Sequence, residues 1–209
     1  MAGVAALLQP RPLVAVACTV LPDGLRAVAA VLAEHEVPLL IAGQDLACPL
    51  ELRYPDPSTL GPDRWVAAWA AHRQFGACVV VDCGTALTVD VVTEAGAFLG
   101  GAIAPGAGTS ARGLSAAVPS LPAPDPSRAL AGVPVTSTDA VGAGVSWGFC
   151  GAVERLVQEI ERAGDVRGAT RVLTGGEAED YLRHGRLEFE HVPDLVHRGL
   201  AALWEAREE

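Results

Sequence analysis

The stretch "VVVDCGTALTVDVV" (Val79–Val92) decides the fold class of this chain. Two apolar segments, predicted as strands over 77–82 and 86–92, flank an acidic turn that contains a glycine, Asp82–Thr85. A buried strand can consist entirely of Val, so an acid followed by a glycine indicates a tight turn or a bound ligand. The second segment also contains an acid, Asp90, which precedes its last two residues, Val91 and Val92.

Working outward from this stretch, helical and strand periods alternate along the chain. Further strands are predicted over 13–20, 37–43, 98–105, 170–176 and 187–190, and helices over 23–35, 62–74, 106–118, 138–163, from 177 and over 193–207. Residues 44–61 and 119–135 are rich in proline and are predicted to be loops. Hairpins next to crossover helices favour an α/β fold with a mixed sheet over a doubly wound parallel one.

Composition excludes several classes of protein. The chain has 209 residues, of which 50% are hydrophobic and 19% charged, which allows one or two domains with a sizeable core. A net charge of −10 disfavours binding to a nucleic-acid backbone. Its fifteen basic residues are all Arg, and without Lys it has neither a P-loop nor Schiff-base chemistry.

The chain is expected to be cytoplasmic. Its five cysteines are odd in number and scattered, which suggests reduced thiols. No apolar run reaches the ~20 residues that a membrane span needs. The N-terminus has no basic segment ahead of its apolar residues, so we expect no secretory signal.

Four stretches contain residues suited to binding an anion or catalysing a reaction. Amides at 83–86 could face a phosphate, and Asp82 could hold the cation that neutralises it; alternatively, this is an ordinary hairpin turn. The glycines of 100–108 allow close approach to a ligand, or simply tight packing. Asp63 suits the first turn of a helix, whereas Arg64 there suggests a carboxylate partner. The glycine pair Gly175 and Gly176 follows a strand, where ligands bind in open α/β sheets, although a plain connection also fits.

Five motifs occur together along the chain: GPDR (61–64), VVDCGTALTVDVV (80–92), FLGGAIAPG (98–106), LP (121–122) and TGG (174–176). In this order they resemble the type III pantothenate kinases, over about residues 13–205. The resemblance implies the actin and acetate kinase type of fold, with two ribonuclease-H-like halves. We therefore expect a partial N-terminal domain over 1–76 and a C-terminal domain over 77–209, whose last helix packs back on the first domain.

The resemblance also implies an activity. The family transfers a phosphoryl group from ATP to pantothenate, forming 4′-phosphopantothenate in coenzyme A biosynthesis, so the chain is expected to be a kinase. It implies Mg²⁺ with ATP and a monovalent cation, K⁺ or NH₄⁺, as cofactors. Pantothenate is the expected small-molecule partner of a homodimer that binds neither nucleic acid nor membrane.

The site residues follow from the same motifs. Asp63 corresponds to the family's general base, and Pro62 replaces an alanine beside it. By resemblance, the residues that bind pantothenate are Tyr54, Gly61, Pro62, Asp63, Arg64 and Ser137; those that bind ATP are Gly84, Thr85, Gly175 and Gly176; and Asp82 binds the monovalent cation. Phosphoryl transfer depends mainly on positioning and charge stabilisation, which backbone amides and cations must supply in the absence of Lys.

One family motif is missing from this sequence. The family begins with a hairpin that carries D-x-G-N-T, its first phosphate loop, whereas this chain has no D-x-G before Asp82 and no Asn at all. We therefore expect the first half of the fold to be truncated, leaving strand 13–20 as a possible bare edge. The start codon could be set too late, another subunit could supply the loop, or the chain could be a degenerate relative. Such a relative would bind pantothenate or a regulatory partner without catalysis.

Overall fold

The computed structural model describes residues 12–19, 22–124 and 132–207. The apolar start of the chain, the last residue of the strand predicted at 13–20 and the middle of the loop at 119–135 lie outside the described residues. The strands are β1 (Ala15–Ala17), β2 (Leu39–Ile41), β3 (Glu51–Leu52), β4 (Cys78–Cys83), β5 (Ala86–Val92), β6 (Ala97–Pro105), β7 (Thr170–Thr174) and β8 (Glu190–His191). The α-helices are α2 (Pro22–Glu34), α3 (Pro62–Phe75), α4 (Ala107–Ala117), α5 (Ser137–Gly164), α6 (Ala178–His184) and α7 (Leu195–Glu205).

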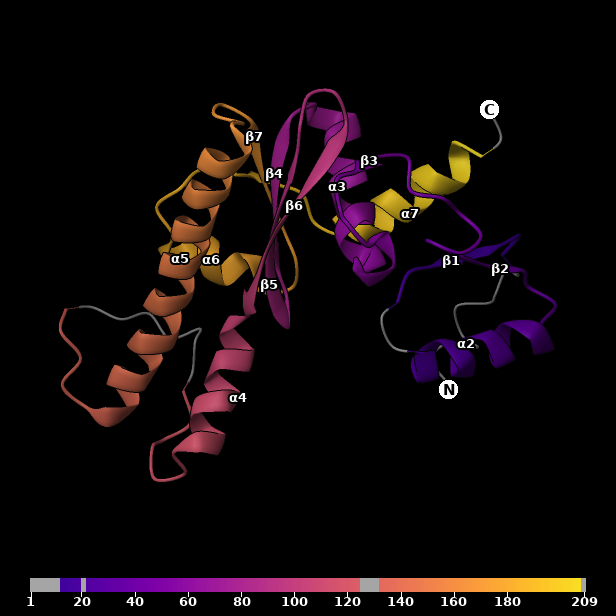
Figure 1. Ribbon diagram of the computed structural model, residues 1–209. Helices are drawn as coiled ribbons and strands as arrows, with labels where there is room; N and C mark the ends of the chain where they lie inside the picture. Colours follow the sequence, from indigo (N-terminus) through magenta and orange to yellow (C-terminus); the bar gives the residue numbers. More distant parts are fainter. Residues whose placement is uncertain (1–11, 20–21, 125–131, 208–209) are drawn as a thin grey trace.

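The central element is a six-stranded sheet with the order β3-β6-β5-β4-β7-β8. Strands β4, β5 and β6 pair antiparallel, whereas β7 joins β4, β8 joins β7 and β3 joins β6 in parallel. The prediction of an α/β fold with a mixed sheet is therefore confirmed. In Figure 1, α5 and α6 lie on one side of this sheet, and α3 and α7 lie on the other.

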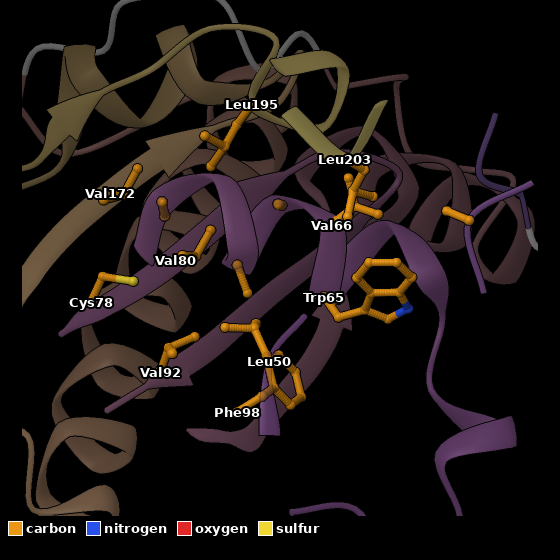
Figure 2. Packing of buried hydrophobic residues seen from close by; sticks show 14 of the residues in the cluster. Leu50, Trp65, Val66, Cys78, Val80, Val92, Phe98, Val172, Leu195 and Leu203 are labelled. Carbon is orange, nitrogen blue, oxygen red and sulfur yellow. The ribbon is translucent and has the colours of Figure 1, made fainter. Parts of the chain in front are cut away.

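Both faces of the sheet are buried, which explains the nearly continuous apolar run of β4. Successive side chains of a strand point to opposite faces. Cys78 and Val80 therefore join a core with α3 and α7, whereas Val79 and Val81 join a core with α5 and α6. Figure 2 shows the first of these cores. Its labelled residues are Leu50, Trp65, Val66, Cys78, Val80, Val92, Phe98, Val172, Leu195 and Leu203.

Helix α3 begins where the sequence predicts. Gly61 is its N-cap residue and Pro62 occupies the first turn, where the missing N–H of proline costs nothing. The helix packs on β4, β5 and α7. Helices α3 and α7 cover the same face of the sheet, which is called the α3 face below. The first turn of α3 lies over this face and forms part of the site described below.

A second, smaller sheet lies to one side of the first (Figure 1). Strands β1 and β2 pair in parallel, and α2 packs on them through a cluster of Val31, Leu32 and Val37. Within the described part of the chain, β1 has one strand neighbour, β2. Two-stranded sheets are marginal by themselves, and α7 adds a contact to β1.

The loop predicted over 44–61 is partly wrong. It contains β3, which pairs in parallel with β6, and a 3-10 helix at Pro57–Thr59. A strand of two residues has no readable period, so only its tertiary partner defines it. No helix in the described ranges is long and apolar enough to cross a membrane.

Candidate functional site

A cavity of about 440 Å³ opens between the first turn of α3 and the turn that joins β4 to β5. Asp63 and Asp82 both line it, so the two acids that the sequence singled out share one space. Its lining comprises Asp63, Arg64, Ala67, Val80, Asp82, Gly84, Thr85, Ala86, Thr88 and Asp90.

Strand alternation explains why these side chains meet. Asp82 lies two residues after Val80 and so belongs to the α3 face of the sheet. In the antiparallel ladder, Asp82 pairs with Thr88, and Val80 pairs with Asp90, which puts all of them on this face. Helix α3 covers the apolar part of the face, while its first turn meets the polar part.

Arg64 forms a buried ion pair with Asp90 in the site. Its side chain is only 7% exposed, and its Nε donates to both carboxylate oxygens of Asp90, at 3.1 and 3.2 Å. Its Nη2 also donates to Asp90, and its Nη1 donates to the hydroxyl of Tyr54 at 3.3 Å. The structure thus gives Arg64 the carboxylate partner that the sequence suggested, and identifies it as Asp90 of the protein itself.

Three acids raise the cost of negative charge in the cavity. Burial first, and then the neighbouring charges of Asp63 and Asp90, together raise the pKa of Asp82 to about 6. Burial also raises the pKa of Asp90, whereas the hydrogen bonds from Arg64 favour its ionised form. One guanidinium facing three carboxylates leaves the cavity acidic, and a cation bound there would be stabilised.

The turn between β4 and β5 is held by a hydrogen bond within the hairpin and by two from the start of α4. Gly84 N donates to Ala86 O at 3.2 Å, which closes the turn. The carbonyl of Thr85 accepts two hydrogen bonds from the start of α4, from Gly106 N at 3.1 Å and from Thr109 Oγ1 at 2.7 Å. The predicted phosphate turn is therefore a fixed part of the fold.

Gly175 and Gly176 line a second cavity, of about 270 Å³, on the β7 side of Asp82. Asp82 lines both cavities. Gly175 has φ +97°, and a Cβ built on it would lie 2.4 Å from both Asp82 Oδ1 and Cys83 O. The TGG stretch is packed so closely against the acidic turn that only glycine fits at position 175.

Ser137 is not brought to the cavity of its own chain. It is the first residue of α5 and lines an apolar groove of about 510 Å³ between α4 and α5. Gly61 and Pro62 begin α3 next to Asp63 but are not among the residues lining the cavity. The roles of Ser137, Gly61 and Pro62 stay predictions.

Sequence reasoning missed two residues as functional residues: Asp90, which lines the cavity, and Glu177, which contacts the start of α4. Asp90 belongs to the D-x-G-T-A-x-T-x-D string, and its position in a buried strand, two residues after Thr88, was the available signal. Glu177 follows the glycine pair and reads locally as the start of a helix. Across the described residues, there is no group of three or more His, Cys, Asp or Glu placed to hold a metal ion.

The mixed sheet and its acidic cavity define an α/β protein with a candidate ligand site at the turn of its central hairpin. The chain belongs to the type III pantothenate kinase family: the family's model, Type III pantothenate kinase, matches residues 3–159. This confirms the family that the motifs indicated.

Individual relatives agree with this assignment. A type III pantothenate kinase of Rubrobacter xylanophilus is 37% identical over 179 residues, which cover 81% of this chain and 66% of the relative. One from Dehalococcoides mccartyi is 34% identical over 168 residues, covering 79% of this chain and 64% of the relative. The chain thus spans about two thirds of the length of the curated relatives it matches.

One solved structure supports the fold alone. It is a conserved protein from Campylobacter jejuni that its name places in the Baf family of transcriptional activators. It superposes with a TM-score of 0.64 at 19% identity, over 98% of this chain and 88% of that protein.

Proposed function

We propose that this chain phosphorylates pantothenate with ATP, forming 4′-phosphopantothenate. The observation that carries the proposal is the single cavity lined by both Asp63 and Asp82. An alcohol next to Asp63 and a triphosphate next to the β4–β5 turn would meet inside it. Membership of the family supplies the substrate class, since its relatives are named as pantothenate kinases.

Asp63 is the proposed general base. It lies in the first turn of α3 and faces the cavity. In the proposed step, a carboxylate oxygen of Asp63 accepts the proton of the primary hydroxyl while the hydroxyl oxygen bonds to the γ-phosphorus. The bond from that phosphorus to the bridging oxygen of ADP breaks at the same time. A positioned base of this kind contributes about 10²–10⁴-fold to the rate.

Asp82 is the proposed ligand of a monovalent cation. The donor set fits, because the carboxylates of Asp63, Asp82 and Asp90 line one cavity with Arg64 as the basic residue among its lining. A bound K⁺ or NH₄⁺ would favour the ionised carboxylate and reduce repulsion between the acids and a triphosphate. Mg²⁺ commonly binds one or two carboxylates together with substrate phosphates, so it needs no cluster of protein ligands here.

Tyr54 and Arg64 are proposed to recognise pantothenate. Arg64 has five N–H donors, and Asp90 and Tyr54 take one on each of its three nitrogens. One hydrogen on each terminal nitrogen is left for a substrate carboxylate, which would share the guanidinium with Asp90. We further propose a cytoplasmic homodimer, for which the apolar groove between α4 and α5 is an available surface.

Product analysis tests the proposal. The purified chain is incubated with pantothenate, Mg²⁺, ATP and K⁺, and 4′-phosphopantothenate is quantified by mass spectrometry. Asp63→Asn is expected to lower the rate at least ~10²-fold. Asp23→Asn is the matched control, because Asp23 is also an acid in the first turn of a helix but is exposed to solvent. Equal rates in wild type and Asp63→Asn would remove Asp63 as the base, and binding of pantothenate without product would support a non-catalytic relative instead.

A further inference from the structure

Glu177 connects three segments that are distant in sequence. Its Oε2 accepts a hydrogen bond from Ala107 N at 2.8 Å, and its Oε1 accepts one from Gly108 N at 3.0 Å. Its own N–H donates to the carbonyl of Cys83 at 2.7 Å. The residue after the TGG stretch therefore holds both the end of β4 and the start of α4.

The carboxylate suits this position chemically. Amides in the first turn of a helix have no partner within the helix, and the positive end of the helix dipole favours an anion there. The two N–H donors bind different oxygens of the carboxylate, whereas a carboxamide would present an NH₂ group to one of them. Charge-assisted bonds of this kind are about twice as strong as neutral ones.

The glycines around the contact leave room for it. A Cβ built on Gly106 would lie 1.9 Å from Gly84 O and 2.7 Å from Glu177 Oε2. A Cβ on Gly108 would lie 2.9 Å from Glu177 Oε1. The Gly-Ala-Gly sequence at the start of α4 therefore has a physical explanation: any side chain at its two glycines would displace the carboxylate or the turn.

These contacts continue into the acidic cavity. Gly106 N and Thr109 Oγ1 both donate to the carbonyl of Thr85, so the start of α4 fixes the β4–β5 turn. Thr85 and Gly84 line the cavity of Asp63, while Gly175, two residues before Glu177, lines the second cavity. A displacement of Glu177 would therefore reach both glycine turns.

We propose that Glu177 is a positioning residue for the nucleotide side of the site. It fixes the Gly84–Thr85 turn relative to the Gly175–Gly176 turn, and it does so through α4 without contacting substrate. This inference rests on the proposed function, in which the two turns hold the nucleotide. It predicts that loss of the carboxylate weakens nucleotide binding and spares pantothenate binding.

Two measurements on the full chain test this. In Glu177→Gln, we expect the dissociation constant of Mg²⁺-ADP, measured by calorimetry, to rise about tenfold or more, as for loss of a hydrogen bond to a charged group. The constant for pantothenate is expected to stay within about twofold. We also expect faster amide hydrogen exchange in the ligand-free chain at Ala107 and Gly108, and at Gly84 and Gly106 of the turn.

Two further variants provide the controls. Glu179→Gln changes an exposed acid in the next helix, α6, and is expected to change neither measurement. Gly108→Ala displaces the carboxylate from the other side, while alanine itself favours the helix. We expect it to reproduce the effects of Glu177→Gln, and the double variant to show less than the sum of the two.

The outcomes separate this inference from the proposed function. Faster exchange at Ala107 and Gly108 alone, with unchanged exchange at Gly84 and unchanged nucleotide affinity, would reduce Glu177 to a helix cap and overturn the inference. A wild-type chain that binds no nucleotide would count against the proposed function. Exchange at Gly84 and Gly106 in Glu177→Gln would then still decide whether Glu177 positions the turn.

Discussion

Replacing Asp82 by Asn should stabilise the ligand-free chain at neutral pH. Burial, and then the charges of Asp63 and Asp90, raise the pKa of Asp82 from 3.8 to about 6. This shift is about two units, and at ~1.36 kcal/mol per unit the ionised carboxylate costs the folded state about 3 kcal/mol. Asparagine keeps the shape of the side chain and removes that cost.

The pH dependence follows from the sign of the shift. The folded chain holds the proton of Asp82 more tightly than the unfolded chain, so the protonated group supports folding at low pH. This contribution is complete below about pH 4 and is lost as the pH rises from about 4 to about 6. Asp82→Asn should therefore be close to neutral at pH 4 and show its full effect at pH 7.5.

Urea unfolding at these two pH values, in a buffer without K⁺ or NH₄⁺, measures the difference. Asp23→Asn is the control, because its exposed carboxylate should give no difference that depends on pH in this way. Adding K⁺ should then stabilise wild type more than Asp82→Asn, since a bound cation offsets the same cost. A variant that is less stable than wild type at pH 7.5, or equally changed at both pH values, would refute the electrostatic account of the cavity.

Three other changes test the surroundings of the cavity. Asp90→Ala should lower the free energy of unfolding, measured in urea, by about 3–5 kcal/mol, because it leaves the buried charge of Arg64 unpaired. Recovery of the free energy of unfolding in an Asp90→Leu, Arg64→Met double variant would support this cause. A decrease of less than about 1 kcal/mol in Asp90→Ala would contradict it. Gly175→Ala should lower the melting temperature, since its φ of +97° and a Cβ 2.4 Å from Asp82 Oδ1 both oppose a side chain, and an unchanged melting temperature would show that the turn relaxes freely. Cys78, whose pKa burial raises to about 12, should resist iodoacetamide at pH 8 until the chain unfolds; mass spectrometry that finds it alkylated in the native chain would contradict its burial.

The hairpin and its neighbours could be predicted because their signals are local. Strand β5 has the predicted bounds, Ala86–Val92, and α3 begins at the predicted Pro62. Both depend on a run of apolar residues or a helix period next to a residue that ends or starts it. Side chains alternate between the two faces along β4, so Asp82 lies on the same face as Val80, which the structure shows to be covered by α3.

The contacts that organise the site could not be predicted, because they join distant segments. Arg64 and Asp90 are 26 residues apart, and Glu177 lies 70 residues from Ala107. Nothing in the neighbourhood of Glu177 distinguishes it from an ordinary residue at the start of a helix. Strand β3 exists only by pairing with β6, so a Pro-rich segment without a period gave no sign of it.

The predicted division into domains at residue 76 stays a prediction. In the structure, β3 from the first part pairs with β6 from the second. Helix α7, from the end of the chain, packs on α3 and contacts β1. These contacts tie the two parts together, and the site itself combines α3 with the β4–β5 hairpin.

A crystal structure of the chain with pantothenate and a non-hydrolysable ATP analogue would measure where the two reacting groups lie. The account predicts the primary hydroxyl within hydrogen-bonding distance of Asp63 and about 3–3.5 Å from the γ-phosphorus, with the phosphates beside Asp82 and the β4–β5 turn. Either ligand bound elsewhere, or a hydroxyl that points away from Asp63, would contradict it.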